Sequence, residues 1–438
     1  MSNFKDKKIL VFGLGLNQGG VGSAKFFASQ GAKVRVTDLK NEDTLKTSLE
    51  QLKQFSNIEY TLGVHKNEDI DWADLIIKNP AIKPGNPYIE YAMQKGKEVK
   101  MDMDIFLQSV SHQQIIGVTG TKGKSTTSSL IYELLKNIGK DVVFAGNIGT
   151  SVLEIIPYIK DDTLVVLEIS SFQLESFDRK KVSPKWAVIT NITPDHLNYY
   201  SSMEEYIAAK RVIAEYQKTD DFLFIRKNDP ITTKPEFLKG LKGQIVYFSR
   251  DDMTKGFKPT LLGEHNLENI AASYQVGNIF GINSERLLRT LTTFKGIPFR
   301  MEQTKIWNGV RIINDTAATS PESGIKSIQT FPNCILICGG MNKKMDYTKY
   351  AEVIDRSVRS VYFLEGDSTE EIKKLMKNKD LIKGTYNNLE KLLRDVKTQV
   401  KPGDVILFAP SATSFNLFQN EFDRGREFNK AVEKVFVR

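Results

Sequence analysis

The stretch Gln114-Ile-Ile-Gly-Val-Thr-Gly-Thr-Lys-Gly-Lys-Ser-Thr126 decides how the central part of this chain folds. Its apolar first half is typical of a buried strand, and residues 125–137 are predicted to form a helix. A glycine-rich loop between a strand and a helix presents backbone amides and the positive end of the helix dipole to phosphate oxygens. We therefore predict a phosphate-binding loop at 117–126, with ATP as its ligand.

The residue types in this loop suggest roles for several of them. Lys124 is expected to contact the transferred phosphate, and Ser125 or Thr126 to reach Mg²⁺. The general loop pattern has glycine at 118, where this chain has Val118. The predicted ATP-binding residues of the loop are Gly120, Thr121, Lys122, Gly123, Lys124, Ser125 and Thr126.

Strand and helix signals alternate on both sides of the loop, which predicts α/β architecture with parallel sheets. Strands are expected at 8–13, 33–38, 74–78, 141–144, 163–169, 186–190, 310–314, 334–338, 360–364 and 404–409. Helices are expected at about 23–30, 266–280 and 284–294. We predict three domains: a Rossmann-like domain at 1–110, a P-loop ATPase domain at 111–296 and a second Rossmann-like α/β domain at 297–438.

A second glycine-rich run, Gly13-Leu-Gly15-Leu-Asn-Gln-Gly-Gly20-Val-Gly22, follows the first predicted strand. Asp38 ends the next strand, as an acidic residue does in dinucleotide-binding units. The glycine spacing differs from the usual dinucleotide motif. The run therefore predicts a phosphate-bearing ligand, with NAD as an alternative and a turn without ligand still open.

The composition of the 438-residue chain excludes several classes of protein. Its 61 basic and 53 acidic residues give a net charge of +8 without a basic block, so nucleic-acid binding is not expected. No run of about 18 apolar residues and no leader-like N-terminus is present, which predicts a cytoplasmic protein without membrane contact. The two cysteines, Cys334 and Cys338, are expected to be buried on one strand face and not to bind zinc.

Several further motifs follow the phosphate loop in order. They are Gly146-Asn-Ile-Gly149, Glu168-Ile-Ser-Ser-Phe-Gln-Leu-Glu175, Asn191-Ile-Thr-Pro-Asp-His196-Leu, Tyr206-Ile-Ala-Ala-Lys210 and Gly263-Glu-His-Asn-Leu-Glu-Asn269. Together with Gly117-Val-Thr-Gly-Thr-Lys-Gly-Lys-Ser-Thr126, this ordered set resembles the Mur ligase family over essentially the whole chain. Within the family, the sequence is most similar to the ligases that add glutamate.

The resemblance implies a reaction and a division of labour between the domains. The first domain would hold UDP-N-acetylmuramoyl-L-alanine, the central one ATP with two Mg²⁺ ions, and the third the incoming glutamate, in the D configuration. The substrate carboxylate would attack the ATP γ-phosphate, and the glutamate amine would then displace phosphate from the acyl phosphate. A monomer is expected.

The resemblance also implies roles for individual residues. Catalytic roles fall on Lys124, His196 and Lys210, the last as a carbamate. Mg²⁺ ligands would be Ser125, Glu168, His196 and Lys210. Further ATP contacts would come from Asn266, Asn269, Arg300 and Asp315. Substrate contacts would come from Gly15, Leu16, Asp38, Asn147, Lys343, Ser414 and Phe415.

The chain departs from the pattern of the glutamate-adding ligases at four places. It has extra residues at 17–20, Lys122 in place of asparagine, Ala317 in place of lysine and Glu421 in place of an aromatic residue. The last two bear on the choice of amino acid, so a ligase that uses L-glutamate is an alternative.

Three other functions compete with this hypothesis. A ligase like folylpolyglutamate synthetase shares the phosphate loop but would begin with the ATPase domain. A non-catalytic nucleotide-binding regulator would not need Lys124, Glu168, His196, Lys210 and Asp315 together. An NAD-dependent oxidoreductase would leave the central phosphate loop without a role.

Overall fold

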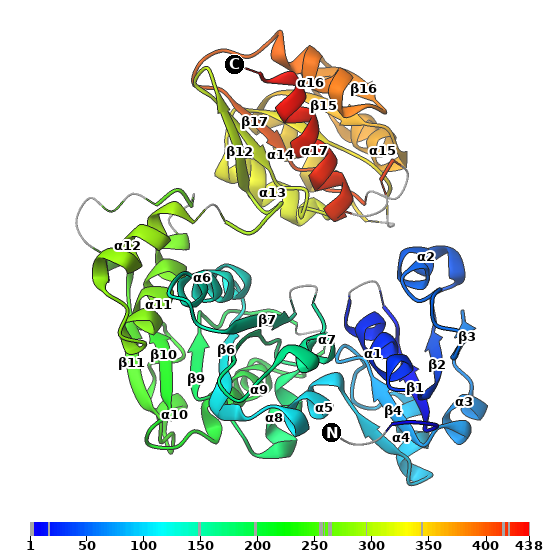
Figure 1. Ribbon diagram of the computed structural model, residues 1–438. Helices are drawn as coiled ribbons and strands as arrows, with labels where there is room; N and C mark the ends of the chain where they lie inside the picture. Colours follow the sequence, from blue (N-terminus) through cyan, green and yellow to red (C-terminus); the bar gives the residue numbers. More distant parts are fainter. Residues whose placement is uncertain are drawn as a thin grey trace. The chain divides into compact units, whose positions relative to one another are not determined.

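The computed structural model describes residues 4–15, 18–147, 150–196, 199–253, 257, 259–261, 265–294, 296–342, 345–413, 417–418 and 421–437. Two compact units result, one formed mainly by the described residues up to 294 and the other by those from 296 onward (Figure 1). Each unit is described by itself. In the described part of the chain, no helix is long and apolar enough to cross a membrane.

The first unit begins with a five-stranded parallel sheet of order β3-β2-β1-β4-β5. Its strands are β1 (Lys8–Phe12), β2 (Lys33–Asp38), β3 (Ile58–Leu62), β4 (Leu75–Lys78) and β5 (Glu98–Lys100). Its helices are α1 (Gln18–Ser29), α2 (Glu42–Glu50), α3 (Asn67–Trp72), α4 (Pro87–Gln94) and α5 (Asp102–Ser109). This order is that of a Rossmann half, as the sequence predicted.

Helix α1 begins at Gln18, five residues before the position that the sequence analysis expected. Glycines in its first turns hid it, because glycine disfavours helices in general. Their absence of side chains is needed: a Cβ on Gly20 would lie 2.2 Å from the Leu14 carbonyl oxygen, and one on Gly22 would lie 2.2 Å from Ser151 Cβ. Small residues thus let α1 approach both the β1 loop and the second sheet's segment at Ser151.

The same unit contains a six-stranded parallel sheet of order β11-β10-β9-β6-β8-β7. Its strands are β6 (Ile115–Thr119), β7 (Val142–Gly146), β8 (Leu164–Glu168), β9 (Trp186–Ile189), β10 (Phe222–Arg226) and β11 (Gln244–Phe248). Its helices are α6 (Lys124–Asn137), α7 (Val152–Ile155), α8 (Leu174–Lys180), α9 (Met203–Glu215), α10 (Pro235–Leu238), α11 (His265–Ile279) and α12 (Ser284–Thr293).

The two faces of this second sheet have different cores. Val118 on β6 packs with Ile131 of α6 and Ala272 of α11. The other face, represented by Leu167 on β8 and Phe177 on α8, belongs to a cluster that continues into the first sheet. A shared apolar core therefore fixes the first two sheets to each other.

The second unit is built on a six-stranded sheet of order β12-β13-β17-β14-β15-β16. Only the pair β12–β13 among these described strands is antiparallel, so the sheet is mixed. Its strands are β12 (Glu302–Trp307), β13 (Val310–Asn314), β14 (Cys334–Cys338), β15 (Val358–Leu364), β16 (Ile382–Tyr386) and β17 (Val405–Phe408). Its helices are α13 (Pro321–Thr330), α14 (Thr348–Ser357), α15 (Asp367–Leu375), α16 (Leu389–Lys397) and α17 (Glu421–Val435).

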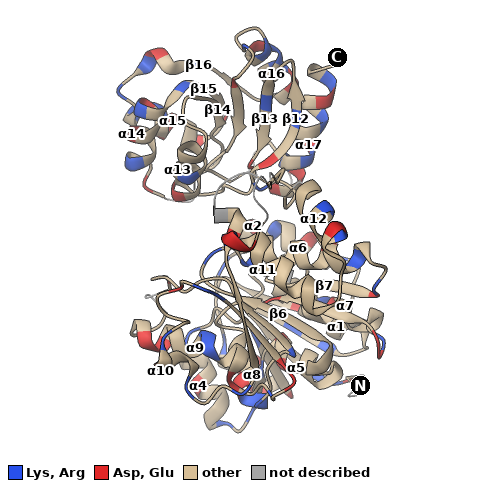
Figure 2. Ribbon diagram, turned by 90° about the vertical axis from the view of Figure 1, so that its left-hand side faces the viewer, with Lys and Arg blue, Asp and Glu red and all other residues tan. Residues whose placement is uncertain are grey.

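Alternation along β14 confirms that the two cysteines are buried on one face of the strand. Cys334 and Cys338 are free, buried thiols on the face covered by α13 and α14, whereas Ile335 and Ile337 pack on the face of α16 and α17. Basic and acidic residues are interspersed on the helices of the chain (Figure 2). The three sheets, two of them parallel and one mixed, alternate with helices along the chain and confirm the predicted α/β fold class.

Substitution of Gly20 tests how closely α1 must approach the β1 loop. Gly20→Ala is expected to destabilise the first unit by about 1–3 kcal/mol, because its Cβ would meet backbone atoms that cannot move independently. Urea unfolding followed by circular dichroism measures this. Gly19→Ala is the matched control in the same helix, since the nearest atom to its Cβ would be Asp102 Oδ2 at 3.9 Å. Equal unfolding midpoints for the two variants would contradict the packing argument.

Candidate active site

The predicted phosphate loop lies between β6 and α6, and two of its glycines are required by geometry. Gly120 has φ +144° and Gly123 has φ +86°. A Cβ on Gly120 would lie 2.0 Å from Thr190 Oγ1, and one on Gly123 would lie 2.2 Å from Asn269 Oδ1. The loop is thus wedged between the end of β9 and helix α11.

The segment after β9 holds the loop by a set of hydrogen bonds. Thr121 N donates to Asn191 O (2.8 Å), and Lys122 N donates to Asn191 Oδ1 (3.0 Å). Thr190 Oγ1 and Asn191 Nδ2 both donate to Lys122 O (2.6 and 2.9 Å). These contacts fix the loop backbone before any ligand binds, as a preorganised phosphate cradle requires.

Two ammonium groups converge on one backbone oxygen of the loop. Lys124 Nζ donates to Gly120 O (2.9 Å) and Thr121 O (3.1 Å), and Lys210 Nζ of α9 donates to Gly120 O (3.0 Å). Tyr206 places its ring 4.7 Å from Lys210 Nζ and shares a 3.2 Å hydrogen bond with Thr121 Oγ1. Two like charges are therefore concentrated where the predicted phosphates would bind.

Lys210 is not an ordinary solvated helix lysine, because only 2% of its surface is exposed. Burial, with a smaller contribution from the charge of Lys124, lowers the pKa of Lys210 to about 7. A substantial fraction of its side chains is then a neutral, nucleophilic amine near neutral pH.

Glu168 ends β8, the strand beside β6, and is 1% exposed. Its Oε1 accepts a hydrogen bond from Asn147 Nδ2 (3.0 Å), whereas its Oε2 is buried and has no hydrogen-bond partner. An unsatisfied buried carboxylate oxygen is costly unless a ligand completes it. Glu168 is thus unlike a surface residue, and Asn147 contacts it directly.

His196 follows β9 in a left-handed conformation, with φ +55°. Its ring lies 5.1 Å from Phe172 and 6.2 Å from Tyr206, centroid to centroid. Burial, aided by the charges of Lys210 and Lys124, lowers the pKa of His196 despite the opposing carboxylate of Asp195. The neutral form, which ligates metals, is therefore favoured.

Asp195 lies next to His196 and pairs with Lys122 (3.0 Å). Burial alone would raise the pKa of Asp195, but its hydrogen bond and ion pair with Lys122 lower it. Lys122, the residue that departs from the family pattern, thus already has an acidic neighbour.

The donor atoms fit Mg²⁺ shared with a bound triphosphate. Mg²⁺ takes hard oxygen ligands and in nucleotide sites needs only one or two carboxylates beside phosphate oxygens. Glu168 offers one buried oxygen of this kind. Among the described residues, no group of three or more His, Cys, Asp or Glu side chains is arranged to hold a metal by itself.

Asn266 and Asn269 lie together on α11 beside the loop. Asn269 Nδ2 donates to Asn266 Oδ1 (2.9 Å), and Thr127 Oγ1 of α6 donates to Asn269 Oδ1 (3.3 Å). Both asparagines are buried. The structure therefore brings them to the phosphate loop, together with Gly123.

In the first sheet, Asp38 lies at the end of β2 and closes the β1 loop. Its Oδ2 accepts from Gly15 N (2.8 Å), and its Oδ1 accepts from Lys40 N (2.9 Å). Leu16 lies outside the described residues. Gly22 of α1, which follows this loop, lies against Ser151 at the start of α7.

In the second unit, Asp315 follows β13 and is buried. It accepts hydrogen bonds from Met301 N (3.0 Å) and from the Ser327 hydroxyl. Burial raises the pKa of Asp315, and the charge of the exposed Arg300 opposes this rise. Lys343, Ser414 and Phe415, the predicted amino-acid contacts, lie outside the described residues.

Near Ala317, the fully buried Arg424 of α17 donates to Thr316 Oγ1 (2.7 Å), Thr316 O (3.0 Å) and Ala412 O (3.0 Å). Burial lowers its pKa to about 9. Arg424, Thr190 and Asn191 were not predicted as site residues from the sequence. Asn191 is the first residue of the motif at 191–196 and Thr190 directly precedes it, so the motif could have indicated both.

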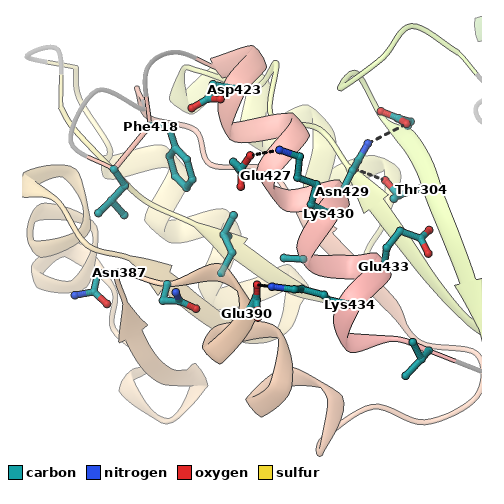
Figure 3. A pocket seen from close by; sticks show the side chains of 16 residues that line it. Thr304, Asn387, Glu390, Phe418, Asp423, Glu427, Asn429, Lys430, Glu433 and Lys434 are labelled. Atoms are coloured by element: carbon teal, nitrogen blue, oxygen red, sulfur yellow. Dashed lines mark hydrogen bonds and ion pairs between the residues drawn. The ribbon is translucent and has the colours of Figure 1, made fainter.

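A surface hollow of about 1140 Å³ lies on the second unit between α17, β12 and the start of α16 (Figure 3). Both lysines of its lining pair with glutamates of the lining: Lys430 with Glu427 (2.7 Å) and Lys434 with Glu390 (2.6 Å). None of the residues predicted from sequence lines it within the described part of the chain. We therefore do not assign a function to this hollow.

The chain forms three α/β sheets in succession, and a preorganised phosphate loop follows strand β6 of the second sheet. This arrangement defines a P-loop enzyme built from three α/β parts. Family models match in the same order: Mur ligase MurD-like N-terminal domain over residues 7–101, Mur ligase middle domain over 118–277 and Mur ligase glutamate ligase domain over 299–412. The chain belongs to the Mur ligase family and is an ATP-dependent ligase that forms an amide bond.

Similar proteins span the whole chain. UDP-N-acetylmuramoylalanine–D-glutamate ligase of Roseiflexus sp. (strain RS-1) is 35% identical, covering 98% of both chains, and that of Borreliella afzelii (strain PKo) is 33% identical, covering 99% of both. Among solved structures, UDP-N-acetylmuramate-alanine ligase MurC from Thermotoga maritima has a TM-score of 0.59 at 21% identity, covering 98% of this chain and 99% of its own. MurF ligase from the same organism, in complex with ADP, has a TM-score of 0.53 at 19% identity, covering 99% and 100%. These two structures support the fold.

The lowered pKa of Lys210 predicts a particular pH dependence of stability. Lysine titrates near pH 10.4 in an unfolded chain, so between about pH 7 and that value the unfolded state binds more protons than the folded state. Stability should therefore rise with pH across this window. We expect wild type to gain stability relative to Lys210→Met between pH 7 and pH 9 in urea unfolding. Parallel pH profiles for the two proteins would show that Lys210 is not desolvated.

Proposed function

We propose that this enzyme joins D-glutamate to the carboxylate of UDP-N-acetylmuramoyl-L-alanine in peptidoglycan precursor synthesis, with ATP hydrolysed to ADP and phosphate. The observation that carries the substrate assignment is the full-length similarity to enzymes named as D-glutamate ligases, at 33–35% identity. A ligase like folylpolyglutamate synthetase is not favoured, because the chain begins with a separate α/β sheet before the ATP-binding one. A non-catalytic regulator is not favoured, because the chain keeps all the charged residues expected of the enzyme: Lys124, Glu168, His196, Lys210 and Asp315.

The proposed first step is attack of the substrate carboxylate on the γ-phosphate, with ADP as the leaving group. Carboxylate and triphosphate repel each other, so the ammonium group of Lys124, which donates to Gly120 O, would supply opposing charge. The amide nitrogens of Thr121 and Lys122 are already held by Asn191, which fixes the loop that carries the phosphates. Phosphoryl transfer would then depend on the alignment of the carboxylate with the γ-phosphate more than on covalent catalysis by the protein.

The proposed second step is attack of the glutamate amine on the acyl phosphate. The tetrahedral intermediate loses phosphate and leaves an amide bond. Asp315 and Arg300 of the second unit are proposed to contact the nucleotide, and Lys343, Ser414 and Phe415 to contact glutamate.

Mg²⁺, when bound, would neutralise the phosphate oxygens during transfer. Glu168 and Ser125 are proposed to hold the first of two ions, and His196 with Lys210 the second. The neutral amine fraction of Lys210, favoured by its pKa of about 7, is the form that can react with carbon dioxide to give an oxygen-bearing carbamate. Asn147 would orient Glu168, which it contacts at 3.0 Å.

The remaining parts of the proposal concern the organisation of the protein. Domain boundaries near 110/111 and 296/297 would separate the UDP-sugar, ATP and amino-acid domains. Gly15, Leu16 and Asp38 are proposed to contact the UDP-sugar. Because both ATP and a nucleotide-activated sugar are intracellular metabolites, the proposal includes a cytoplasmic enzyme, acting as a monomer.

Phosphate release tests the substrate assignment. With ATP, Mg²⁺ and UDP-N-acetylmuramoyl-L-alanine, we expect release when D-glutamate is added and little with L-glutamate. Lys124→Met should lower the rate by about a hundredfold or more, since it removes a cation aimed at the transferred phosphate. Lys136→Met, an exposed lysine in the last turn of α6, is the matched control. A rate that rises with L-glutamate alone, or with neither amino acid, would overturn the assignment.

Glu168 should show a trade-off between stability and activity. Glu168→Gln keeps the Asn147 contact geometry but removes a buried charge with one unsatisfied oxygen. We expect thermal stability to be equal to or higher than that of wild type, while Mg²⁺-dependent ATP binding measured by calorimetry weakens about tenfold or more. Unchanged Mg²⁺ dependence would remove Glu168 from the proposed ligands.

A further inference from the structure

Glu175, in the first turn of α8, has no role in the chemistry proposed above, yet it joins both sheets of the first unit. Tyr199 Oη donates to Glu175 Oε1 (3.0 Å). The other oxygen, Oε2, pairs with Lys78 Nζ (3.4 Å) and with Arg179 Nη1 (3.6 Å). The Glu175 side chain is 31% exposed and that of Lys78 is 12% exposed, so this carboxylate lies at a partly buried seam.

On one side, the contact leads to the turn that carries His196. Both Tyr199 N and Tyr200 N donate to His196 O (2.8 and 3.0 Å). The ring of Phe172 contacts the rings of both Tyr199 and His196, with centroid distances of 4.3 and 5.1 Å. Because His196 has a left-handed backbone, which non-glycine residues rarely adopt, the surrounding contacts must hold this turn.

On the other side, the contact leads to the glycine loop of the first sheet. Lys78 is the last residue of β4 and pairs in register with Phe12, the last residue of β1. The next residue, Asn79, donates through its backbone N to Phe12 O (2.9 Å) and through Nδ2 to Gly13 O (3.3 Å). Glu175 is therefore linked through Lys78 to the start of the loop proposed to hold the UDP-sugar.

Arg179 extends the same network to the connection between the two sheets. It donates to Asp104 Oδ2 (2.6 Å), on helix α5, while its other nitrogen faces Glu175. Asp104 in turn accepts from Met101 N (2.7 Å), directly after β5. The carboxylate of Glu175 is thus held from the α5 side as well as from β4.

We propose that Glu175 is a positioning residue that fixes the position of the His196 turn relative to the glycine loop of the first sheet. It does so through Tyr199 on one side and Lys78 on the other. It touches none of the reacting groups. Its effect on catalysis rests on the proposed function of His196, whereas its effect on the turn does not.

An ordinary surface ion pair is the competing explanation, since exposed pairs contribute little to stability. The Tyr199 contact differs from such a pair because a neutral phenol donates to a carboxylate, and hydrogen bonds to charged groups are stronger than those between neutral groups. Loss of that hydroxyl should therefore loosen the turn measurably.

Hydrogen–deuterium exchange tests the structural half with the full-length enzyme. In Tyr199→Phe and Glu175→Ala, the backbone amides at positions 199 and 200 are expected to exchange about tenfold faster than in wild type. Tyr216→Phe is the matched control: Tyr216 Oη donates to Asp178, also on α8, but this pair has no described contact with the His196 turn. Unchanged exchange in Tyr199→Phe, or equal acceleration in Tyr216→Phe, would overturn the proposal.

Steady-state kinetics tests the catalytic half. Tyr199→Phe and Glu175→Ala should lower kcat by about tenfold and leave KM for ATP unchanged, because the phosphate loop is held separately by Asn191. Lys78→Met and Glu175→Ala should each raise KM for the UDP-sugar several-fold, because each removes the Lys78–Glu175 contact. Combining Lys78→Met with Glu175→Ala should add little to Glu175→Ala alone, since both remove one linkage.

These measurements separate the two proposals. If wild type does not use the proposed substrates, the function assignment fails, while the exchange result still decides the role of Glu175. If wild type is active and kcat in Glu175→Ala equals that of wild type, the positioning role in catalysis is wrong.

Discussion

The carbonyl oxygen of Gly120 accepts hydrogen bonds from two ammonium groups, those of Lys124 and Lys210, and much of the candidate site depends on this contact. Two amines on one oxygen disfavour a charge on both, and burial together with the charge of Lys124 lowers the pKa of Lys210 to about 7. The absence of a Cβ at Gly120 is what lets the loop lie against Thr190. Backbone sterics thus bring the two lysines together, and an anion bound here would stabilise the charge of Lys124.

Several nearby groups carry a cost in the protein alone. Glu168 Oε2 is buried without a hydrogen-bond partner, Lys210 is desolvated, and His196 has a left-handed backbone. Each feature is unfavourable for folding by itself. Their concentration around the carboxyl ends of β8 and β9 and the facing helix α9 is typical of a site organised for ligands and not for maximal stability. The extensive shared core of the first unit offsets these costs.

The sequence predicted the interior strands better than the sheet edges. Buried strands such as Ile115–Thr119 and Cys334–Cys338 are continuous apolar runs, and their positions follow from that pattern. Strands β3, β5, β11, β12 and β16 were not predicted from the sequence; they lie at sheet edges and carry exposed or partly exposed residues. Half-solvated edge strands lack a strong apolar signal, so neighbouring strands decide their conformation. Interior β10 was also missed.

By itself, the sequence determined the phosphate loop, the positions of most interior strands along the chain and the shared face of Cys334 and Cys338. These features depend on local backbone sterics and on hydrophobic periodicity, which a few neighbouring residues encode. Only the tertiary structure decided that Lys210 is a buried amine against Gly120, 90 residues away, that Glu168 keeps an unsatisfied oxygen, and that Glu175 joins Tyr199 to Lys78. Desolvation and hydrogen bonding depend on which distant elements surround a group, and that arrangement exists only in the folded chain.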